Sequence, residues 1–470
     1  MKPLNRTTAQ ITSDRKIKVL QFGTGNFLRG FVDWVIDILN EKTDFHGDIQ
    51  IVQPHGKVPA ATLNTQEGLY HILTRGFQHN RVVEESRLIS SVRGAINPFS
   101  DYREYLKLAE NPDLRFVVSN TTEAGIVFDP KDTDREQAPV TFPGKLTALL
   151  YRRFVYFEGK GDKGLILIPC ELIENNGIKL KEAVLQYADL WRLPEEFTRW
   201  LTDRNIFCNT LVDRIVPGFP EEDSETIQQS LGYKDELMVV AEPFHFWAIE
   251  GPASVAAEFP ADTVGLDIIF VKDLKPYRER KVRILNGAHT TMVPLAYLKG
   301  FRTVREAVED ESMGDFIKSA IQEEIIPTLD LPQKELDQFA SDVLERFKNP
   351  FIRHMLSAIA LNSVSKWQVR VLPSLLEYEK RKGTLPVKLV QAFAALIVFY
   401  RGRYKGEDLP VKDSAEITAF FIEAWQKQEI VEMVEEILAN KTLWGRDLNT
   451  VSGLKARLTP EVEALLDREN

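Results

Sequence analysis

The chain has 470 residues, which is too many for one hydrophobic core and suggests two or three domains. Its 44% hydrophobic and 27% charged residues are typical of an ordinary globular protein. A net charge of −10 argues against a nucleic-acid binder, and two cysteines exclude a disulfide framework or a cysteine-based zinc site. The N-terminus lacks a signal-peptide core and no run of about 18 apolar residues occurs, so we expect a soluble cytoplasmic protein that does not enter a membrane.

The first half of the chain alternates strand-like and helix-like segments. KIKVLQFG (16–23) predicts a buried strand, and FLRGFVDWVIDIL predicts a helix after it. Further strands are expected at 48–54, 114–120, 164–170, 236–242 and 266–272. Strands separated by helices imply right-handed crossovers, so the pattern predicts an α/β domain with a mostly parallel sheet. After about residue 275 amphipathic patterns such as LVQAFAALIVFYRGRY replace the strands, which predicts a helical domain.

The segment FGTGNFLRGF follows the first strand and opens the first helix, which is the context of a dinucleotide-binding loop. Gly23 would permit the tight turn, and Gly25 the close approach of backbone to a pyrophosphate. Leu28 replaces the third glycine of the usual fingerprint, and Gly30 comes two residues later. The predicted cofactor contacts in this loop are Phe22, Gly23, Thr24, Gly25, Asn26, Phe27 and Arg29.

The choice between NAD and NADP depends on the end of the second strand. An acidic residue there usually binds the ribose 2′-hydroxyl, but here the nearest residue is Gln53. No arginine follows at once to hold a 2′-phosphate. The residues leave NAD and NADP open, with a preference for NAD.

The segment KVRILNGAHT (281–290) is expected to be helical. Its apolar stripe comprises Val282, Leu285, His289, Met292 and Ala296. Lys281, Asn286 and His289 lie on or beside that stripe, at about 0°, 140° and 80° around an α-helical axis, so they share one side. Pro294 is expected to kink or end the helix.

These residue types suit hydride transfer between a carbinol and a ketone, which needs a proton donor or acceptor at the oxygen and hydrogen-bond donors for the alkoxide. A lysine can move the proton when burial or nearby cations depress its pKa, and arginines stand at 278, 280 and 283. An amide can hold the oxygen, and a histidine can orient the lysine or the substrate. The alternative is that all three polar residues are solvated or hydrogen-bonded parts of the helix.

K-x4-N-x2-H resembles the catalytic signature of the polyol-specific long-chain dehydrogenases, the mannitol dehydrogenase family. Other matching segments are GTGNFLRG (23–30), NTQEGLY (64–70), TLVDRIVP (210–217), EPFHFWAIEG (242–251) and RFKNPFI (346–352). They span nearly the whole chain in the family's order. The resemblance implies a Rossmann-type N-terminal domain over 1–275, an α-helical C-terminal domain over 276–470, no metal, and a catalytic lysine.

Carried over by motif, the resemblance makes Lys281 the general acid/base. Asn286, together with Asn176 of ENNG, would hold the carbonyl oxygen as it becomes an alkoxide. His289 would bind the substrate and position the lysine. Asp213 of VDR and Asn120 of SNTTEAGI would lie at the cofactor.

Substrate choice is expected downstream of RFKNPFI. Mannitol dehydrogenases carry an arginine where this chain has Ala358, and their D-G-S is replaced by residues 362–364 (NSV), which argues against a plain sugar alcohol. SNTTEAGI, FPGKLTALLYRRF and PCELIENNG resemble most the family members that act on hexuronates. A uronate carboxylate calls for a cation, for which Arg353, Arg370 and Lys366 are the candidates.

Three alternatives remain open from the sequence. One is a different uronate or a sugar alcohol as the substrate within the same family. Another is a cofactor-binding regulator that has lost catalysis, and the third is a structural two-domain protein. The oligomeric state is also left open.

Overall fold

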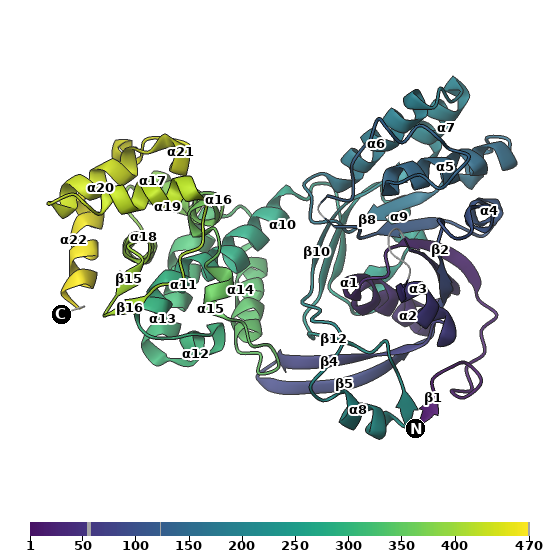
Figure 1. The fold of residues 1–470 in the computed structure, drawn as a ribbon, viewed down its shortest axis with the longest axis horizontal. Coiled ribbons are helices and arrows are strands. Elements are labelled where there is room, and N and C mark those ends of the chain that lie inside the picture. Colours follow the sequence, from purple (N-terminus) through teal and green to yellow (C-terminus); the bar gives the residue numbers. More distant parts are fainter. Residues whose placement is uncertain (54–57, 123, 469–470) are drawn as a thin grey trace. The chain divides into compact units, whose positions relative to one another are not determined.

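The computed structural model describes residues 1–53, 58–122 and 124–468, so Pro54 of the second predicted strand and Glu123 of SNTTEAGI lie outside the described residues. The chain forms two compact units (Figure 1). Unit 1 comprises Met1–Arg75 and Val83–Leu274, and unit 2 comprises Gly76–Val82 and Lys275–Asn470.

Unit 1 is built on a six-stranded sheet whose neighbouring strands all run parallel. In spatial order the strands are β6 (Val92–Ile96), β3 (Gly47–Val52), β2 (Lys16–Phe22), β7 (Phe116–Ser119), β8 (Ile166–Pro169) and β9 (Ile206–Phe207). The strand order reverses between β2 and β7, which is the doubly wound Rossmann arrangement with its ligand crevice at the switch point. The predicted Rossmann-type fold is confirmed.

Successive residues of each central strand point into two separate cores, because side chains alternate along a strand. In β2, Val19 packs with Phe31 and Val35 on one face of the sheet. Leu20 packs with Leu146 on the other face. The sheet is therefore covered on both sides, as parallel sheets are.

The helices of unit 1 are α1 (Asn26–Gly30), α2 (Val32–Lys42), α3 (Val58–Thr65), α4 (Tyr102–Lys107), α5 (Phe142–Tyr156), α6 (Asn176–Leu190), α7 (Glu195–Arg204), α8 (Ser224–Leu231) and α9 (Ser254–Glu258). Figure 1 shows α5, α6 and α7 gathered on one side of β8. The predicted first helix is divided in two, since α1 ends at Gly30 and α2 begins at Val32.

Two predicted strands lie outside the main sheet. The segment 236–242 forms β12 (Val239–Ala241), which pairs with β4 (Tyr70–Gln78), and 266–272 forms β14 (Ile268–Val271), which pairs with β13 (Phe246–Glu250). β10 (Asn209–Asp213) runs antiparallel to β13.

The strands β4, β6, β9, β10 and β13 were not predicted, and neither was β5 (Arg81–Ile89). Its sequence RVVEESRLI is exposed over most of its length, so charged residues interrupt the apolar pattern. A short pair of β1 (Lys2–Pro3) with β11 (Tyr233–Lys234) completes the strands of unit 1.

Unit 2 is helical, as predicted, apart from the short ribbon of β15 (Arg403–Tyr404) and β16 (Glu407–Asp408) and the hairpin tip at Gly76–Val82. Its α-helices are α10 (Lys275–Arg280), α11 (Gly287–Leu298), α12 (Val304–Glu309), α13 (Glu311–Ser319), α14 (Gln333–Phe347), α15 (Leu356–Ile359), α16 (Ser363–Arg370), α17 (Leu372–Lys382), α18 (Val387–Phe399), α19 (Ala415–Ala424), α20 (Ile430–Ala439), α21 (Lys441–Trp444) and α22 (Leu454–Asp467). Two segments, Lys281–Asn286 and Ala320–Ile325, are π-helical.

The tip of the β4–β5 hairpin belongs to unit 2. His79 and Asn80 both have positive φ, as a type I′ turn requires. Their backbone N–H groups donate to the carboxylate of Glu345 on α14, at 2.9 and 3.2 Å.

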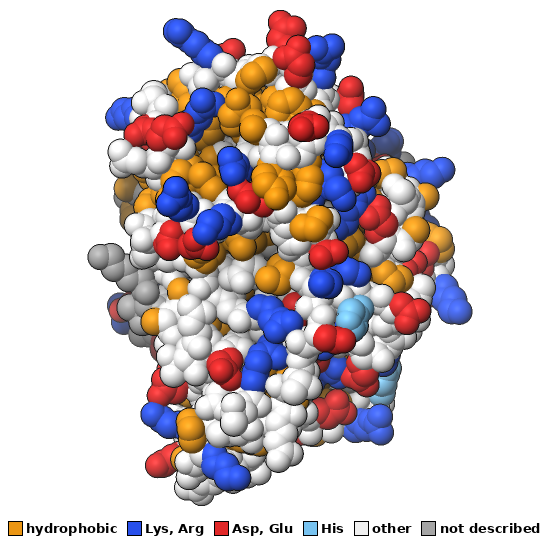
Figure 2. Space-filling model, turned by 90° about the vertical axis from the view of Figure 1, so that its right-hand side faces the viewer, with side chains coloured by type: hydrophobic (Ala, Val, Ile, Leu, Met, Phe, Trp, Pro, Cys, Tyr) orange, Lys and Arg blue, Asp and Glu red, His pale blue; other side chains and the backbone are white. Residues whose placement is uncertain are grey.

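The surface carries both charges. On the face shown in Figure 2, acidic and basic side chains are interspersed, so the net charge of −10 is not gathered into one patch there. Among the residues that the structure describes, no helix is long and apolar enough to span a membrane.

Candidate functional site

The glycine loop lies at the carboxyl ends of the central strands of unit 1. Gly23 has a φ of +133°, which favours glycine, and its N–H donates to the carbonyl oxygen of Val52, at 3.1 Å. A Cβ at Gly23 would come within 2.9 Å of Leu28 and 3.0 Å of the carbonyl oxygen of Asn120. The turn therefore needs glycine here for its φ and for the space.

Gly25 and Gly30 have different environments. Gly25 is exposed, and a Cβ there would meet no atom within 4 Å, so its backbone can be approached closely from outside. A Cβ at Gly30 would lie 2.7 Å from Val216 and 3.1 Å from Val239. Gly30 thus permits the close packing of helix on strand for which the usual fingerprint employs its third glycine.

The other predicted loop contacts differ in their access to a ligand. Thr24 is half-buried and Asn26 is exposed, whereas the ring of Phe22 is buried against Phe142 at 4.8 Å. Phe27 is half-buried, with its ring 5.1 Å from that of Phe31. Of these side chains, Phe22 could reach a cofactor only through its backbone.

Arg29, another predicted cofactor contact, is buried beneath the loop. Its guanidinium donates to Leu237 O at 2.6 Å, Asn26 Oδ1 at 2.8 Å and Thr24 O at 3.3 Å. It therefore supports the loop from the protein side.

Gln53 follows β3 and Asn120 follows β7, the two strands that lie on either side of β2 in the sheet. The side chain of Gln53 is buried, and its Oε1 accepts a hydrogen bond from the Ala60 N–H at the start of α3, at 3.0 Å. Asn120 is half-buried and donates to the carbonyl oxygen of Cys170, at 2.8 Å. The structure thus brings both residues to the edge of the sheet where the glycine loop lies.

Asp213 is buried at the last position of β10. The next residue, Arg214, donates to Gly30 O at 2.7 Å and to Glu242 O at 2.9 Å, and burial lowers its pKa to about 9. The VDR segment is therefore hydrogen-bonded to the end of α1, beside the glycine loop.

Asn176, the other amide predicted to hold the substrate oxygen, is buried at the start of α6. It is 1% exposed, and its Nδ2 lies within 3.0–3.3 Å of four acceptor atoms, on Pro169, Glu171 and Thr210. Its Oδ1 accepts from the N–H of Thr210 at 2.9 Å. The amide joins the start of α6 to β8 and β10, and its predicted contact with a substrate oxygen stays a prediction. The neighbouring Asn175 is exposed.

In unit 2, the segment that bears Lys281 and Asn286 is a π-helix, not the α-helix assumed in the sequence analysis. The N–H of Gly287 bonds back to Val282 O, five residues earlier. The backbone hydrogen bonds of a π-helix join residues that are five apart. Lys281 and Asn286 are five apart, so the angle between their side chains around the helix axis is smaller than the predicted 140°. Both side chains are half-buried.

The helix α11, which follows, differs from the prediction in two ways. It is buried on all sides from Gly287 to Ala296, so the apolar stripe was too narrow a description. It also continues through Pro294 and ends only at Leu298.

His289 lies near the amino end of α11 with little exposed surface. Its ring centroid is 4.3 Å from that of Phe347 and 5.0 Å from that of His354. Burial lowers the pKa of His354, which favours its neutral form. The RFKNPFI segment therefore packs beside the K-x4-N-x2-H segment, and sequence reasoning missed His354, two residues beyond that motif.

Lys366 and Arg370 lie one helical turn apart on α16. Lys366 Nζ donates to Ile359 O at 2.8 Å, and its pKa is lowered by burial and by the charge of Arg370. The carbonyl oxygen of Arg370 would lie 3.2 Å from a Cβ on Gly287, so the end of α16 abuts the residue after Asn286. The helix that carries both cations thus lies beside the K-x4-N-x2-H segment.

Arg353, the third candidate cation, is exposed and lies near Glu306 on α12. The pKa of the Glu306 carboxyl is lowered by the backbone N–H groups at 302 and 303 and also by the charge of Arg353. Arg353 therefore has an acidic neighbour on α12.

A buried carboxyl at the carboxyl edge of the sheet was also missed. Glu171, after β8, accepts from Ser119 Oγ and from Thr121 N and Oγ1, each at 3.0 Å, and burial raises its pKa. An acidic residue directly after the apolar run GLILIPC was the available signal.

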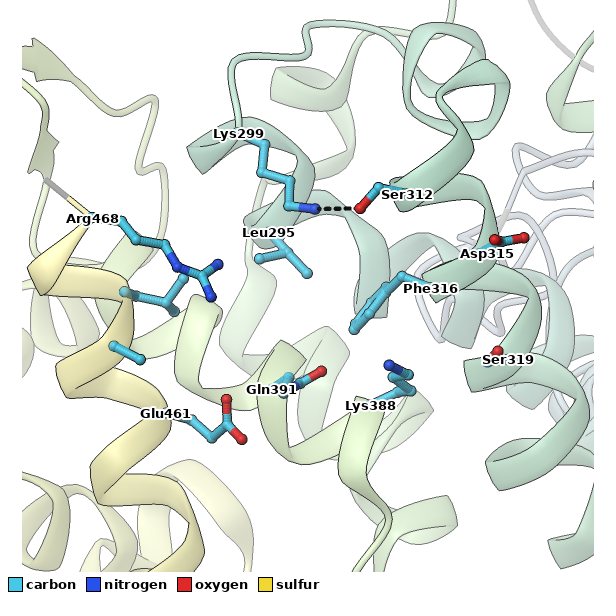
Figure 3. A pocket seen from close by; sticks show the side chains of 12 residues that line it. Leu295, Lys299, Ser312, Asp315, Phe316, Ser319, Lys388, Gln391, Glu461 and Arg468 are labelled. Carbon is cyan, nitrogen blue, oxygen red and sulfur yellow. Dashed lines mark hydrogen bonds between the residues drawn. The ribbon is translucent and has the colours of Figure 1, made fainter.

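A pocket of about 290 Å³ lies elsewhere in unit 2 (Figure 3). Lys299, Lys388 and Arg468 contribute positive charge to its wall, and Asp315 and Glu461 negative charge. None of the predicted site residues lines it, and it adjoins the carboxyl end of α11, whereas Asn286 and His289 lie at the amino end. It is not the candidate catalytic site.

Two family models match the chain. One, described as the mannitol dehydrogenase Rossmann domain, matches residues 17–262, and the other, the mannitol dehydrogenase C-terminal domain, matches residues 273–466.

The chain is 48% identical, over 97% of its length, to a protein of Bacillus subtilis (strain 168) named altronate oxidoreductase, of which it covers 94%. It is 47% identical, over 100% of its length, to a protein of the same name from Phocaeicola vulgatus, of which it covers 98%.

Two solved structures share the fold. A D-sorbitol dehydrogenase in substrate-free form has a TM-score of 0.81 at 22% identity, with 99% of this chain and 100% of that chain covered. Mannitol 2-dehydrogenase of Pseudomonas fluorescens, in a ternary complex with NAD and D-mannitol, has a TM-score of 0.69 at 21% identity, with 100% and 98% covered. At these identities the likeness shows the fold alone.

Proposed function

Because the chain belongs to the mannitol dehydrogenase family, we propose that it is an NAD-dependent reductase that interconverts D-tagaturonate and D-altronate by hydride transfer, a step of hexuronate catabolism. The observation that carries the proposal is the match, from end to end, with proteins named altronate oxidoreductase. The glycine loop and the K-x4-N-x2-H segment are both intact.

The residues of the glycine loop fit a dinucleotide. Gly23 makes the tight turn, and the open space around Gly25 lets a pyrophosphate approach the backbone. Gln53 at the end of β3 carries no negative charge and no cation, so it neither repels nor attracts a 2′-phosphate. A bound nicotinamide would supply or accept the hydride.

The proton is assigned to Lys281. As a general acid it would protonate the ketone oxygen during reduction, and as a base it would remove the same proton during oxidation. Asn286 would donate its amide hydrogen to the oxygen as negative charge develops there. His289, packed against Phe347 and His354, would orient the substrate.

The uronate carboxylate is assigned to Arg370, with Lys366 beside it. Arg370 combines a position at the end of α16, against Gly287, with a charge that burial leaves weakly solvated. Arg353 is the weaker candidate because it is exposed and has Glu306 nearby.

A substrate panel tests the proposal. Tagaturonate, fructuronate and fructose would each be offered with NADH and with NADPH, and we expect tagaturonate with NADH to give the highest kcat/KM. A preference for fructuronate would identify fructuronate reductase, the nearest alternative. A preference for fructose would contradict the uronate assignment, and NADH binding without turnover would indicate a regulator.

We further propose that the protein works in the cytoplasm. Cys170 and Cys208, the two cysteines, are buried and unpaired, which suits a reducing compartment.

A further inference from the structure

Three buried polar residues lie together beneath the glycine loop of unit 1. Arg29 is in α1, Asp33 is in the first turn of α2, and Tyr70 is the first residue of β4. The exposed fractions of their side chains are at most 7%. Nothing in the proposed chemistry requires an acid and a phenol at this place.

Arg29 holds the loop in its observed form. Two of its nitrogens donate to Thr24 O and Asn26 Oδ1, on either side of Gly25. A third nitrogen donates to Leu237 O at 2.6 Å, which ties the loop to the segment before β12. The position of this guanidinium therefore sets the path of the backbone that a pyrophosphate would meet.

Tyr70 and Asp33 in turn hold Arg29. The Tyr70 hydroxyl lies 2.6 Å from Asp33 Oδ2 and 3.2 Å from Arg29 O, and the guanidinium carbon lies 5.3 Å from the centre of the Tyr70 ring. Burial raises the pKa of Asp33 to about 7, and the Tyr70 hydrogen bond and the charge of Arg29 oppose that rise. A buried guanidinium needs such partners, because an uncompensated buried charge is strongly destabilising.

We propose that Asp33 and Tyr70 are positioning residues for the dinucleotide, because through Arg29 they keep the Thr24–Asn26 backbone in its binding conformation. The inference rests on the proposed function, since it assumes that the loop binds NADH. It assigns the two residues no contact with cofactor or substrate.

The test uses the full chain with Tyr70→Phe, which removes the hydroxyl, and Asp33→Asn, which removes the charge but still accepts from Tyr70. In each variant KM for NADH should rise about tenfold, while kcat at saturating NADH stays within about threefold of wild type. When Tyr70→Phe or Asp33→Asn is added to an Arg29→Lys variant, KM for NADH should rise by much less than a further tenfold. The reason is that the effects of substitutions within one network are not additive.

The matched controls are Tyr187→Phe and Asp48→Asn, a buried tyrosine and a buried aspartate of unit 1 bonded elsewhere. They should lower the melting temperature and leave KM for NADH unchanged.

The inference is overturned if KM for NADH in Tyr70→Phe and Asp33→Asn stays within twofold of wild type, even when their melting temperatures fall. Should Tyr70→Phe not fold, Asp33→Asn decides alone. Wild-type protein that binds no NADH would instead refute the proposed function, so the two failures are distinguishable.

Discussion

The π-helical turn at Lys281 changes how a single residue relates to its neighbours. In an α-helix, Lys281 and Asn286 would diverge by about 140°. The π turn reduces that angle, so the ammonium and the amide can serve one oxygen atom. π-helical turns carry a cost in helix geometry and are frequent at functional sites, which supports the assignment of these residues.

Replacement of Lys281 by alanine should lower kcat by about 10²–10⁴-fold, the usual contribution of a general acid or base. The measurement is NADH oxidation with tagaturonate at saturating substrate. Lys299→Ala, at the far end of α11, is the matched control and should leave kcat unchanged. A Lys281→Ala enzyme within tenfold of wild type would show that another group moves the proton.

Arg370 and Arg353 can be compared directly. Arg370→Ala should raise KM for tagaturonate about 10–100-fold, since a hydrogen bond to a charged group contributes ~1.5–3 kcal/mol. Arg353→Ala should change it less than threefold. Steady-state kinetics with both variants decides between them, and the opposite ranking would move the carboxylate site to Arg353.

Asp33 should make stability depend on pH. Its folded pKa of about 7 exceeds the ordinary 3.8, so the folded chain binds more protons between those values. The contribution of this group to stability is therefore fully present below pH 4 and is lost as pH rises through 7. Asp33→Asn should remove that loss, so from pH 5 to pH 8 its melting temperature should fall less than that of wild type. If the melting temperatures of wild type and Asp33→Asn fell equally between pH 5 and pH 8, the raised pKa of Asp33 would be contradicted.

At the scale of elements, the glycine loop must leave room for a ligand and also let a helix pack closely on a strand. The usual dinucleotide-binding fingerprint meets both requirements with three closely spaced glycines. Gly25 leaves room for a ligand, whereas Gly30 leaves room for Val216 and Val239. The glycine that permits this packing stands two residues later than in the standard fingerprint. The sequence therefore does not match the fingerprint, although the fold is the same.

Gly25→Ala and Gly30→Ala form a matched pair. Gly30→Ala should destabilise unit 1 by about 1–3 kcal/mol, because its Cβ overpacks against two valines. Gly25→Ala should leave the urea midpoint unchanged and raise KM for NADH severalfold. Both effects in one variant would mean that packing and binding are not separable here.

Sequence reasoning recovered the central strands because each is a short apolar run between turn residues, as in β2 and β8. It missed the edge strands β6 and β9 of the main sheet and the strands β4, β10 and β13. It also missed β5, whose exposed charges break the apolar alternation. It did not foresee that Asn176 is buried, because a motif gives a residue's neighbours along the chain but not its hydrogen-bond partners on β10. It could not foresee the π-helix, since KVRILN fits either helical period.

For the whole molecule, cofactor binding should appear as heat protection. NADH at 100 times its Kd should stabilise the protein by about 2.7 kcal/mol, whereas NADPH at the same concentration should give a smaller shift. Differential scanning fluorimetry measures both. Equal protection by the two cofactors would contradict the preference for NAD, and a structural protein would show neither.

The hairpin tip that rests on Glu345 also bears on how the chain is made. Gly76–Val82 leaves the ribosome early, whereas Glu345, 266 residues after His79, emerges late. Contacts this distant in sequence form slowly because a long loop must first close. Biosynthesis therefore leaves the tip without its Glu345 contacts until α14 appears, and unit 2 is completed by a segment translated before most of unit 1.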